Sequence, residues 1–421
     1  MTSPLLTRIA AEHAAALAAQ PAAPQSLQHR RSALQGLLAR GLPTTRDENW
    51  RYANLRPLEK ANFTPAATAP APGAAELPAG IEGFTRFVFV DGQFAPQLSA
   101  APGSVGAATV TRLQGELATH AQALALLNEA FATDGADIQV AAGGAAVDLE
   151  VLFYSSSTAA AYPRLNVRLA ANARLRLIER HLGSAATAQF INCVARVQVD
   201  EGGACSHYRL QETGAGATWT DTVEVTVGRD ARYDLHLVQV GALAARSSIE
   251  VTLAGPAAQT RIDAVALADG QQVHDTMIVV DHQAARTRTV ENFRGIAGGR
   301  ARIGFNGMIM VRDTASHADS AQSLKGLIAG PDAEIDLRPQ LEIHTDEVRC
   351  SHGATTGKLD EAMLFYLLTR GIEPPVAQRL LKWAFITDVV ARIDVPALRV
   401  LVQRSLASRM QDAQSLEELL T

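Results

Sequence analysis

The chain has few cysteines and few aromatic residues. Cys193, Cys205 and Cys350 are the three thiols in 421 residues, and an odd number in a long chain argues against a disulfide framework. Phenylalanine, tryptophan and tyrosine make up only 5% of the residues, so a core must rest on valine, leucine, isoleucine and alanine. Cys193 and Cys205 lie in alternating sequence, where cysteine commonly behaves as a small buried apolar residue.

Charge blocks and long apolar runs are also missing. The formal net charge is −5 without a basic block, which argues against a nucleic-acid-binding protein. No stretch reaches the roughly 18 apolar residues that a membrane helix requires. Glu12 and His13 interrupt the N-terminal segment where a signal peptide would have its apolar run. These features predict a cytoplasmic protein that does not enter a membrane.

Signatures of nucleotide hydrolysis and of nucleophilic catalysis are absent from the sequence. Residues 353–358 read G-A-T-T-G-K, whereas a P-loop has four residues between its glycines and a Ser or Thr after the lysine. No G-x-S-x-G motif occurs. We therefore expect a non-catalytic chain, and any ATP-driven role would have to come from a second protein.

Helical patterns are predicted at both ends of the chain. Near the N-terminus, two sets of apolar residues recur at helical spacing: Leu5, Ile9, Ala16 and Leu17, then Leu34, Leu37 and Leu38. Gly41 ends the second helix, and the proline-rich residues 60–83 predict an extended linker. Residues 1–84 are thus predicted to form a helical domain with a Pro/Ala-rich linker.

The C-terminal residues 353–421 are predicted to form a second helical domain. Asp360 is placed to cap a helix over residues 361–369, and Pro374 and Pro375 open another. A third helix is expected over about residues 396–410. This domain either caps the β region or presents a face to a partner.

Between these ends the sequence alternates with a period of two. A strand and turn are predicted over residues 87–92 and a helix near residues 113–131. From about Asp137 the alternation continues almost without a helix, and an ordinary globular domain would contain more helix. Residues 85–352 are therefore predicted to form a β core.

A repeat lies within this alternation. Copies combine a turn, an alanine and a strand, and their alanines are spaced by 31, 27, 27 and 27 residues: Ala173, Ala204, Ala231, Ala258 and Ala285. Ala301 and Ala333 begin copies that keep the signature but not the spacing. Units of this kind bury their apolar faces against each other. The repeat favours a β-solenoid, with a β-sandwich of hairpins as the alternative.

The most unusual stretch is E-I-H-T-D-E-V-R-C-S-H-G at residues 342–353. Thiolate and imidazole are ligands that borderline metals prefer. Because positions two apart on a strand share a face, Cys350 and His352 would emerge together, joined by His344 and Asp346 if the strand is unbroken. A second chain would have to complete a tetrahedral site. The alternative is that these side chains are structural.

Residues 339–357, P-Q-L-E-I-H-T-D-E-V-R-C-S-H-G-A-T-T-G, closely resemble the signature of the SufB/SufD family of iron–sulfur cluster assembly proteins. The F-N-G at 305–307 and the E-N-W-R-Y at 48–52 also resemble family motifs. Within the family the chain resembles the SufD branch, because SufB proteins are usually longer and often carry an N-terminal cysteine cluster.

The resemblance implies a right-handed parallel β-helix flanked by helical domains. It also implies a complex with SufB and the ATPase SufC, and self-association when SufB is absent. His352, with Cys350 nearby, would face a SufB cysteine at the end of the β-helix. There, iron or an iron–sulfur cluster would be shared transiently, with no cofactor held stably. The sequence that continues this signature, F-Y-L at 365–367 and R-G-I at 370–372, also resembles the family. The resemblance implies that SufC binds the C-terminal helices, here at Phe365, Tyr366, Arg370, Gly371 and Ile372.

Two other classes of protein remain open. A passive β-solenoid interaction scaffold would share the coils and leave Cys350 and His352 without metal chemistry. A carbohydrate-active β-helix enzyme would show a signal peptide and a row of Asp, Lys or Arg along one coil face. Neither feature is visible in the sequence.

Overall fold

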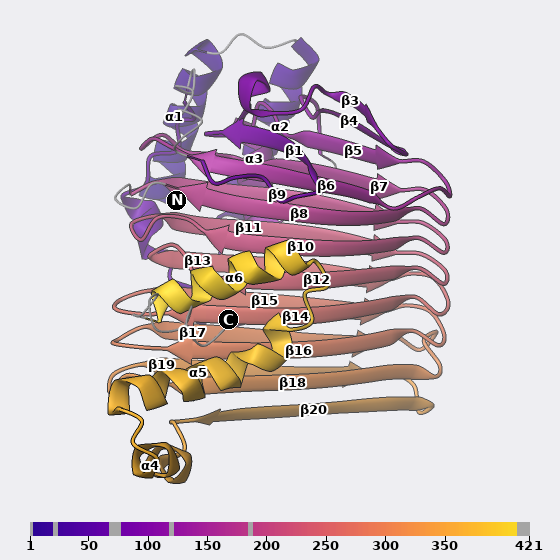
Figure 1. Ribbon diagram of the computed structural model, residues 1–421. Coiled ribbons are helices and arrows are strands. Elements are labelled where there is room, and N and C mark those ends of the chain that lie inside the picture. Colours follow the sequence, from indigo (N-terminus) through magenta and orange to yellow (C-terminus); the bar gives the residue numbers. More distant parts are fainter. Residues whose placement is uncertain (1–2, 20–23, 67–76, 118–121, 184–187, 411–421) are drawn as a thin grey trace.

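A parallel β-solenoid forms the centre of the computed structural model, which describes residues 3–19, 24–66, 77–117, 122–183 and 188–410 (Figure 1). Two ten-stranded sheets face each other, and the chain passes from one sheet to the other at each turn of the coil. The solenoid prediction is therefore confirmed, and the β-sandwich alternative is wrong.

The first sheet contains the following strands in spatial order: β2 (Gln93–Phe94), β1 (Thr85–Val90), β6 (Val147–Ser155), β8 (Arg174–Gly183), β10 (Ala204–Glu212), β12 (Arg232–Gln239), β14 (Gln259–Ala268), β16 (Arg288–Ala297), β18 (Ala318–Ile328) and β20 (Val348–Gly357). The second sheet runs as β19 (Glu334–Ile343), β17 (Arg302–Val311), β15 (Val273–His282), β13 (Ala244–Leu253), β11 (Thr218–Val227), β9 (Phe190–Val199), β7 (Arg164–Leu169), β5 (Ala136–Val140), β4 (Ala108–Arg112) and β3 (Gly103–Val105). Antiparallel pairs occur only at the N-terminal end among these strands, where β2 pairs with β1 and β3, β4 and β5 pair in succession.

Inward-pointing residues of both sheets form one continuous core. Leu235 and Ile262 are register neighbours on β12 and β14, and Ile249 and Ile278 are neighbours on β13 and β15. All four are fully buried in the same apolar cluster. Alternate residues of each strand point inward, and the inward-pointing positions of successive coils lie in register. They therefore stack into one core, as expected for units that cannot bury their apolar faces alone.

The register explains where the alanine repeat holds and where it fails. Ala173, Ala231 and Ala258 occupy equivalent positions before their strands, but Gly203 and Thr287 hold this position in the copies assigned to Ala204 and Ala285. Ala301 and Ala333 are neighbours of each other in the second sheet. Their spacing differs because they belong to a different stack of strands.

Helices cover one outer face of each sheet. Near the N-terminus, α1 (Pro4–Ala19) and α2 (Pro24–Arg40) contact α3 (Ala123–Phe131), which lies on β9 and β11 of the second sheet. Near the C-terminus, α5 (Pro374–Val390) and α6 (Pro396–Arg409) cross the first sheet (Figure 1) and bury Ile386 and Leu398 on it. Short 3-10 turns occur at Glu48–Trp50, Arg56–Glu59 and Pro96–Leu98. Among the described helices, none is long and apolar enough to cross a membrane.

Gly41 ends α2 in the left-handed conformation, with a φ of 82°, as predicted. In the predicted linker, Phe63 and Ile81 are buried and anchor the described parts of residues 60–83. The rest of that prediction, residues 67–76, lies outside the described residues.

The helix predicted near residues 113–131 is shorter than expected and begins at Ala123. Residues 113–117 are not helical because their backbone groups bond elsewhere in the fold. The Leu113 amide donates to the Gly135 carbonyl, and the Gly115 carbonyl accepts from the Arg164 guanidinium. At the other end of the core, β20 continues to Gly357, beyond the predicted boundary at residue 352.

Candidate functional site

The solenoid has an open end. Strands β19 and β20 are the last strands of their sheets, and both lie at the same end of the coil stack (Figure 1). Most of β20 is exposed, whereas the equivalent positions on β18 alternate between buried and exposed. An uncovered edge strand offers unpaired backbone groups to another chain. This end is therefore suited to pairing with a second protein.

Cys350 and His352 lie on β20, two residues apart, so their side chains leave the strand on the same face. Cys350 is half-buried and packs near Ile309 and Val311. Burial and the nearby Asp319 carboxylate raise the pKa of the Cys350 thiol above its ordinary value. His352 is exposed at the open end, beside Gln322 of β18.

His344 and Asp346 do not share this face. Strand β19 ends at Ile343 and β20 begins at Val348, so both residues belong to the intervening turn. The imidazole Nε2 of His344 lies 2.8 Å from Glu342 Oε1. The unbroken strand that would have aligned these residues with Cys350 does not form. Among the described residues, no group of three or more His, Cys, Asp or Glu side chains is arranged to hold a metal ion.

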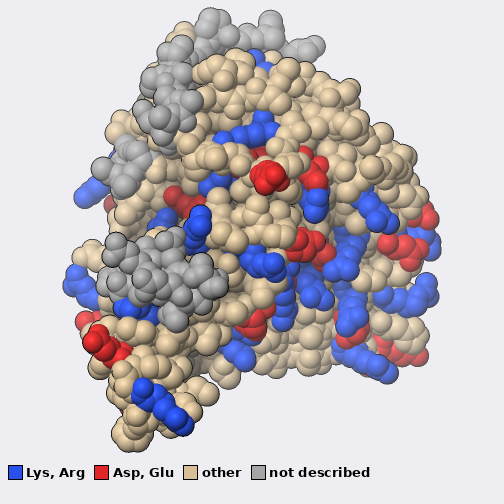
Figure 2. Space-filling model, viewed as in Figure 1, with Lys and Arg blue, Asp and Glu red and all other residues tan. Residues whose placement is uncertain are grey.

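The short helix α4 (Glu361–Thr369) projects beyond β20 and buries none of its residues. Asp360 caps it, accepting hydrogen bonds from the amides of Ala362 and Met363, and Gly371 follows it with a φ of 81°. Three large apolar side chains are 58%, 68% and 57% exposed: Met363, Phe365 and Tyr366. The corresponding lobe at the lower left of Figure 2 carries few charged groups.

The other residues of the predicted partner surface lie at the C-terminal end of α4. Arg370 places its guanidinium carbon 5.1 Å from the centre of the Tyr366 ring. Ile372 is half-buried, and its amide donates to the Leu367 carbonyl. An exposed apolar group of this kind on a helix is characteristic of an interaction surface.

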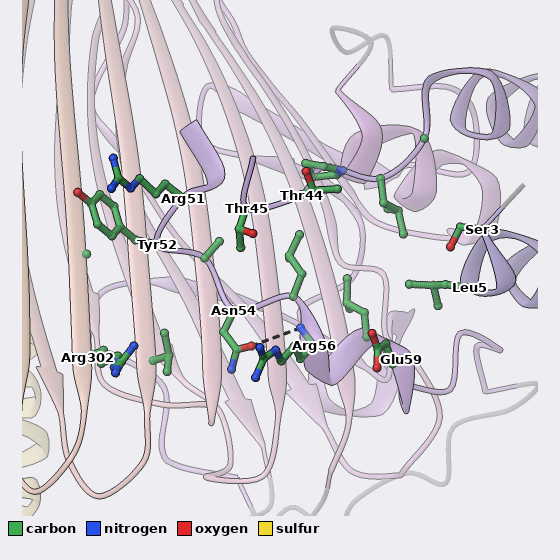
Figure 3. A pocket seen from close by; sticks show the side chains of 18 of the residues that line it. Ser3, Leu5, Thr44, Thr45, Arg51, Tyr52, Asn54, Arg56, Glu59 and Arg302 are labelled. Carbon is green, nitrogen blue, oxygen red and sulfur yellow. Dashed lines mark hydrogen bonds between the residues drawn. The ribbon is translucent and has the colours of Figure 1, made fainter. Parts of the chain in front are cut away.

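The E-N-W-R-Y motif fastens the N-terminal segment to the second sheet. The Arg246 guanidinium lies 4.4 Å from the centre of the Trp50 ring and donates to the Asn49 carbonyl. Beside it, a cavity of about 1170 Å³ has Arg51 and Tyr52 on one side and Arg302 of β17 on another (Figure 3). This cavity lies apart from Cys350 and His352, which do not line it.

Several polar residues inside the coil were not predicted from the sequence. Arg209 of β10 pairs with Glu179 of β8 and Asp221 of β11, and the three are buried. His207 and His181 also contact Glu179. Burial alone would raise the pKa of Glu179, but Arg209 and His181 hold it well below its ordinary value. These partners come from successive strands, so no local motif marks them.

A second buried acid, Glu291 of β16, lies closer to the open end. It is fully buried, and Gln322 Nε2 donates to its Oε2 over 3.3 Å. Burial raises the pKa of Glu291 to about 7, and the bond from Gln322 only partly opposes this. The sequence feature connected with Glu291 is the F-N-G motif, because Gly307 of this motif lies against the Glu291 carboxyl across the coil.

Residues 152–385 match the family model described as SUF system FeS cluster assembly, SufBD core domain. The chain belongs to the SufB/SufD family. It is 28% identical to the iron–sulfur cluster assembly protein SufD of Escherichia coli over 396 residues, which cover 92% of this chain and 93% of that protein. A SufBD family protein of Synechocystis is 27% identical over 401 residues, 87% of each chain. One from Mycobacterium tuberculosis is 25% identical over 268 residues, 62% of this chain and 66% of that protein.

These relationships confirm the resemblance seen in the sequence, including its assignment to the SufD branch. The SufB/SufD family serves iron–sulfur cluster assembly, and this membership agrees with a scaffold subunit of the Suf system.

Proposed function

We propose that this chain is the SufD-type subunit of an iron–sulfur cluster assembly scaffold, pairing with SufB and with the ATPase SufC. The observation that carries the proposal is the position of Cys350 and His352 on β20, the uncovered last strand of the first sheet. A partner that covers this end would meet both side chains. The chain would support iron entry and cluster formation without hydrolysing ATP itself.

The open end suits a partner that also ends in a parallel solenoid. Both β19 and β20 offer backbone groups on their outer edges, and Leu337 and Leu341 of β19 are half-buried. A second solenoid end would continue the strand pairing and complete the burial of these side chains. SufB fits this description through the family, and a second copy of this chain would use the same edge when SufB is absent.

Cys350 and His352 supply two of the four ligands of a tetrahedral centre, so the partner would supply the remainder. Thiolate and imidazole suit iron, and a cysteine of SufB opposite His352 would complete a shared binding surface. The raised pKa of Cys350 favours the protonated thiol in the free chain. Cys350 would become a ligand only when iron or a positively charged partner group stabilises its thiolate.

Replacing His352 by alanine is expected to lower the iron and sulfide that co-purify anaerobically with SufB and SufC by more than about tenfold. The His352 side chain is exposed in this chain, so its removal should leave the fold and the formation of the complex with SufB and SufC intact. His344→Ala is the matched control, because it removes an exposed imidazole from the neighbouring turn. If the His352→Ala complex forms and keeps its iron and sulfide, His352 is not a functional ligand and the chain is a passive architectural subunit.

The exposed face of α4 is the proposed SufC surface. Changing Phe365 and Tyr366 together to serine is expected to weaken SufC binding by at least roughly 30-fold, because even a single buried aromatic anchor contributes about 2 kcal/mol or more. Stability should hardly change, since both side chains are exposed. Val400→Ser on α6 removes an exposed apolar side chain outside this face and serves as the control. Equal SufC affinity for all variants in a calorimetric titration would place the contact elsewhere.

ATP-driven dimerisation of SufC would then act on the C-terminal helices of SufB and of this chain. Because α5 and α6 pack on the first sheet, a force on them would reach the strands near the open end. The driving free energy is the difference in affinity of the SufC states for two arrangements of these helices. Opening the shared interface would admit iron and sulfide to Cys350 and His352.

A further inference from the structure

Buried carboxylates in this protein are generally neutralised by a cation. Among the described residues, seven form an ion pair with an arginine: Glu129, Asp134, Glu150, Glu179, Asp221, Asp263 and Asp275. Glu291 forms no ion pair with a described residue, although it is as deeply buried as any of them. A buried charge without a partner is costly, and proteins usually pair it or use it to bind a metal.

Glu291 lies in register with the candidate site. It pairs with Gln322 of β18, and Gln322 pairs in turn with His352 of β20. Each step between neighbouring strands is ~4.8 Å, and equivalent positions point to the same face of the sheet. Glu291, Gln322 and His352 therefore form a short column that runs from the interior to the open end.

The column carries two acceptor atoms without a hydrogen-bond partner in the described part of the chain, Glu291 Oε1 and Gln322 Oε1. Both are buried oxygen atoms. Behind Glu291 the same register position is held by Ile262, which is fully buried and apolar. The polar column thus ends at Glu291 in one direction and opens toward His352 in the other.

Gly307 of β17 makes room for this column from the opposite sheet. A Cβ atom there would lie 2.5 Å from Glu291 Oε1 and 2.7 Å from Gln322 Nε2. Any other residue would push the carboxylate and the amide out of their positions. The glycine of the F-N-G motif is therefore accounted for by the space that Glu291 and Gln322 occupy.

We propose that Glu291 and Gln322, with His352 at the mouth, form a binding site for a divalent transition-metal ion entering at the open end. The Oε1 atoms would supply one carboxylate and one amide oxygen, and His352 an imidazole nitrogen, a donor set compatible with ferrous iron. The ion would supply the positive charge that Glu291 lacks. This proposal rests on the proposed function, because it includes His352 as a ligand. It adds a site that binds iron before the cluster is assembled.

The test uses the full chain, freed of metal and titrated anaerobically with Co²⁺, whose visible absorption reports its ligands. The wild type is expected to bind one ion, and Glu291→Gln to weaken binding by at least about tenfold. Gln322→Leu should also weaken it. Glu334→Gln is the matched control, because it removes an exposed carboxylate from β19 at the same end. Unchanged binding by both column variants, or no binding by the wild type, would overturn the proposal.

A second measurement separates this site from the assembly role of His352. In complexes with SufB and SufC, Glu291→Gln should slow the appearance of iron while leaving complex formation intact. If His352→Ala loses iron and Glu291→Gln fills at the wild-type rate, the column is refuted and the assembly role stands. If Glu291→Gln alone loses iron, Glu291 and Gln322 bind the ion without His352, and the role of His352 fails both as a ligand of the column and in assembly.

Discussion

Replacing Arg209 by methionine is expected to destabilise the chain by on the order of 3–5 kcal/mol, because it strands two buried carboxylates. Arg209 Nη1 lies 2.6 Å from Asp221 Oδ2, and its Nε lies 2.8 Å from Glu179 Oε2. The histidines that contact Glu179 neutralise it only when they are protonated, and burial lowers the pKa of His207. Urea unfolding at pH 7, followed by circular dichroism, measures the loss.

Two further variants identify the cause of that loss. Adding Glu179→Gln and Asp221→Asn to Arg209→Met removes both stranded charges and should recover most of the stability. Arg232→Met changes an exposed arginine of the next strand in the sheet and should cost little. If Arg209→Met were no more harmful than Arg232→Met, the buried network would contribute nothing that distinguishes it from a surface ion pair.

Glu291→Gln is expected to stabilise the metal-free chain at alkaline pH. The pKa of Glu291 rises from 4.5 to about 7 on folding, because burial disfavours its charged form. Below pH 4.5 the carboxyl is protonated in both states and has no effect. As pH rises toward 7 and beyond, the unfolded state ionises more readily, and folding loses stability of on the order of 3 kcal/mol. Glutamine removes this penalty.

Unfolding of wild type and Glu291→Gln should therefore coincide near pH 4 and diverge above pH 7, with the variant more stable. Burial and the hydrogen bond from the Gln322 amide set the pKa of this carboxyl, and neither Gln322 nor the adjacent Gly307 titrates. Glu334→Gln should follow the wild type at every pH. Equal stabilities at pH 8 would mean that the carboxylate is neutralised in the folded chain. A buried acid retained at such a cost is typical of a residue kept for function.

Much of the fold could be predicted because its signal is local and repeated. A strand of a two-sheet coil shows alternation wherever it lies, so the β core and the C-terminal helices were visible in the sequence. The sequence C-S-H at residues 350–352 was visible for the same reason, since Cys350 and His352 lie on one strand. The helical conformation predicted for residues 113–117 does not form, because tertiary hydrogen bonds engage the backbone groups that a helix would have used.

The sequence by itself determined the coil, the helical ends and the pair Cys350 and His352, because each depends on spacing within one segment. Only the tertiary structure decided the register between coils. The turns differ in length, so the register advances by 27 residues from Arg232 to Gln259 and by 31 from Arg288 to Asp319. That register places Glu291 and Gln322 behind His352, and the turn after Ile343 takes His344 and Asp346 off the strand. Contacts between coils depend on these lengths, and no single segment encodes them.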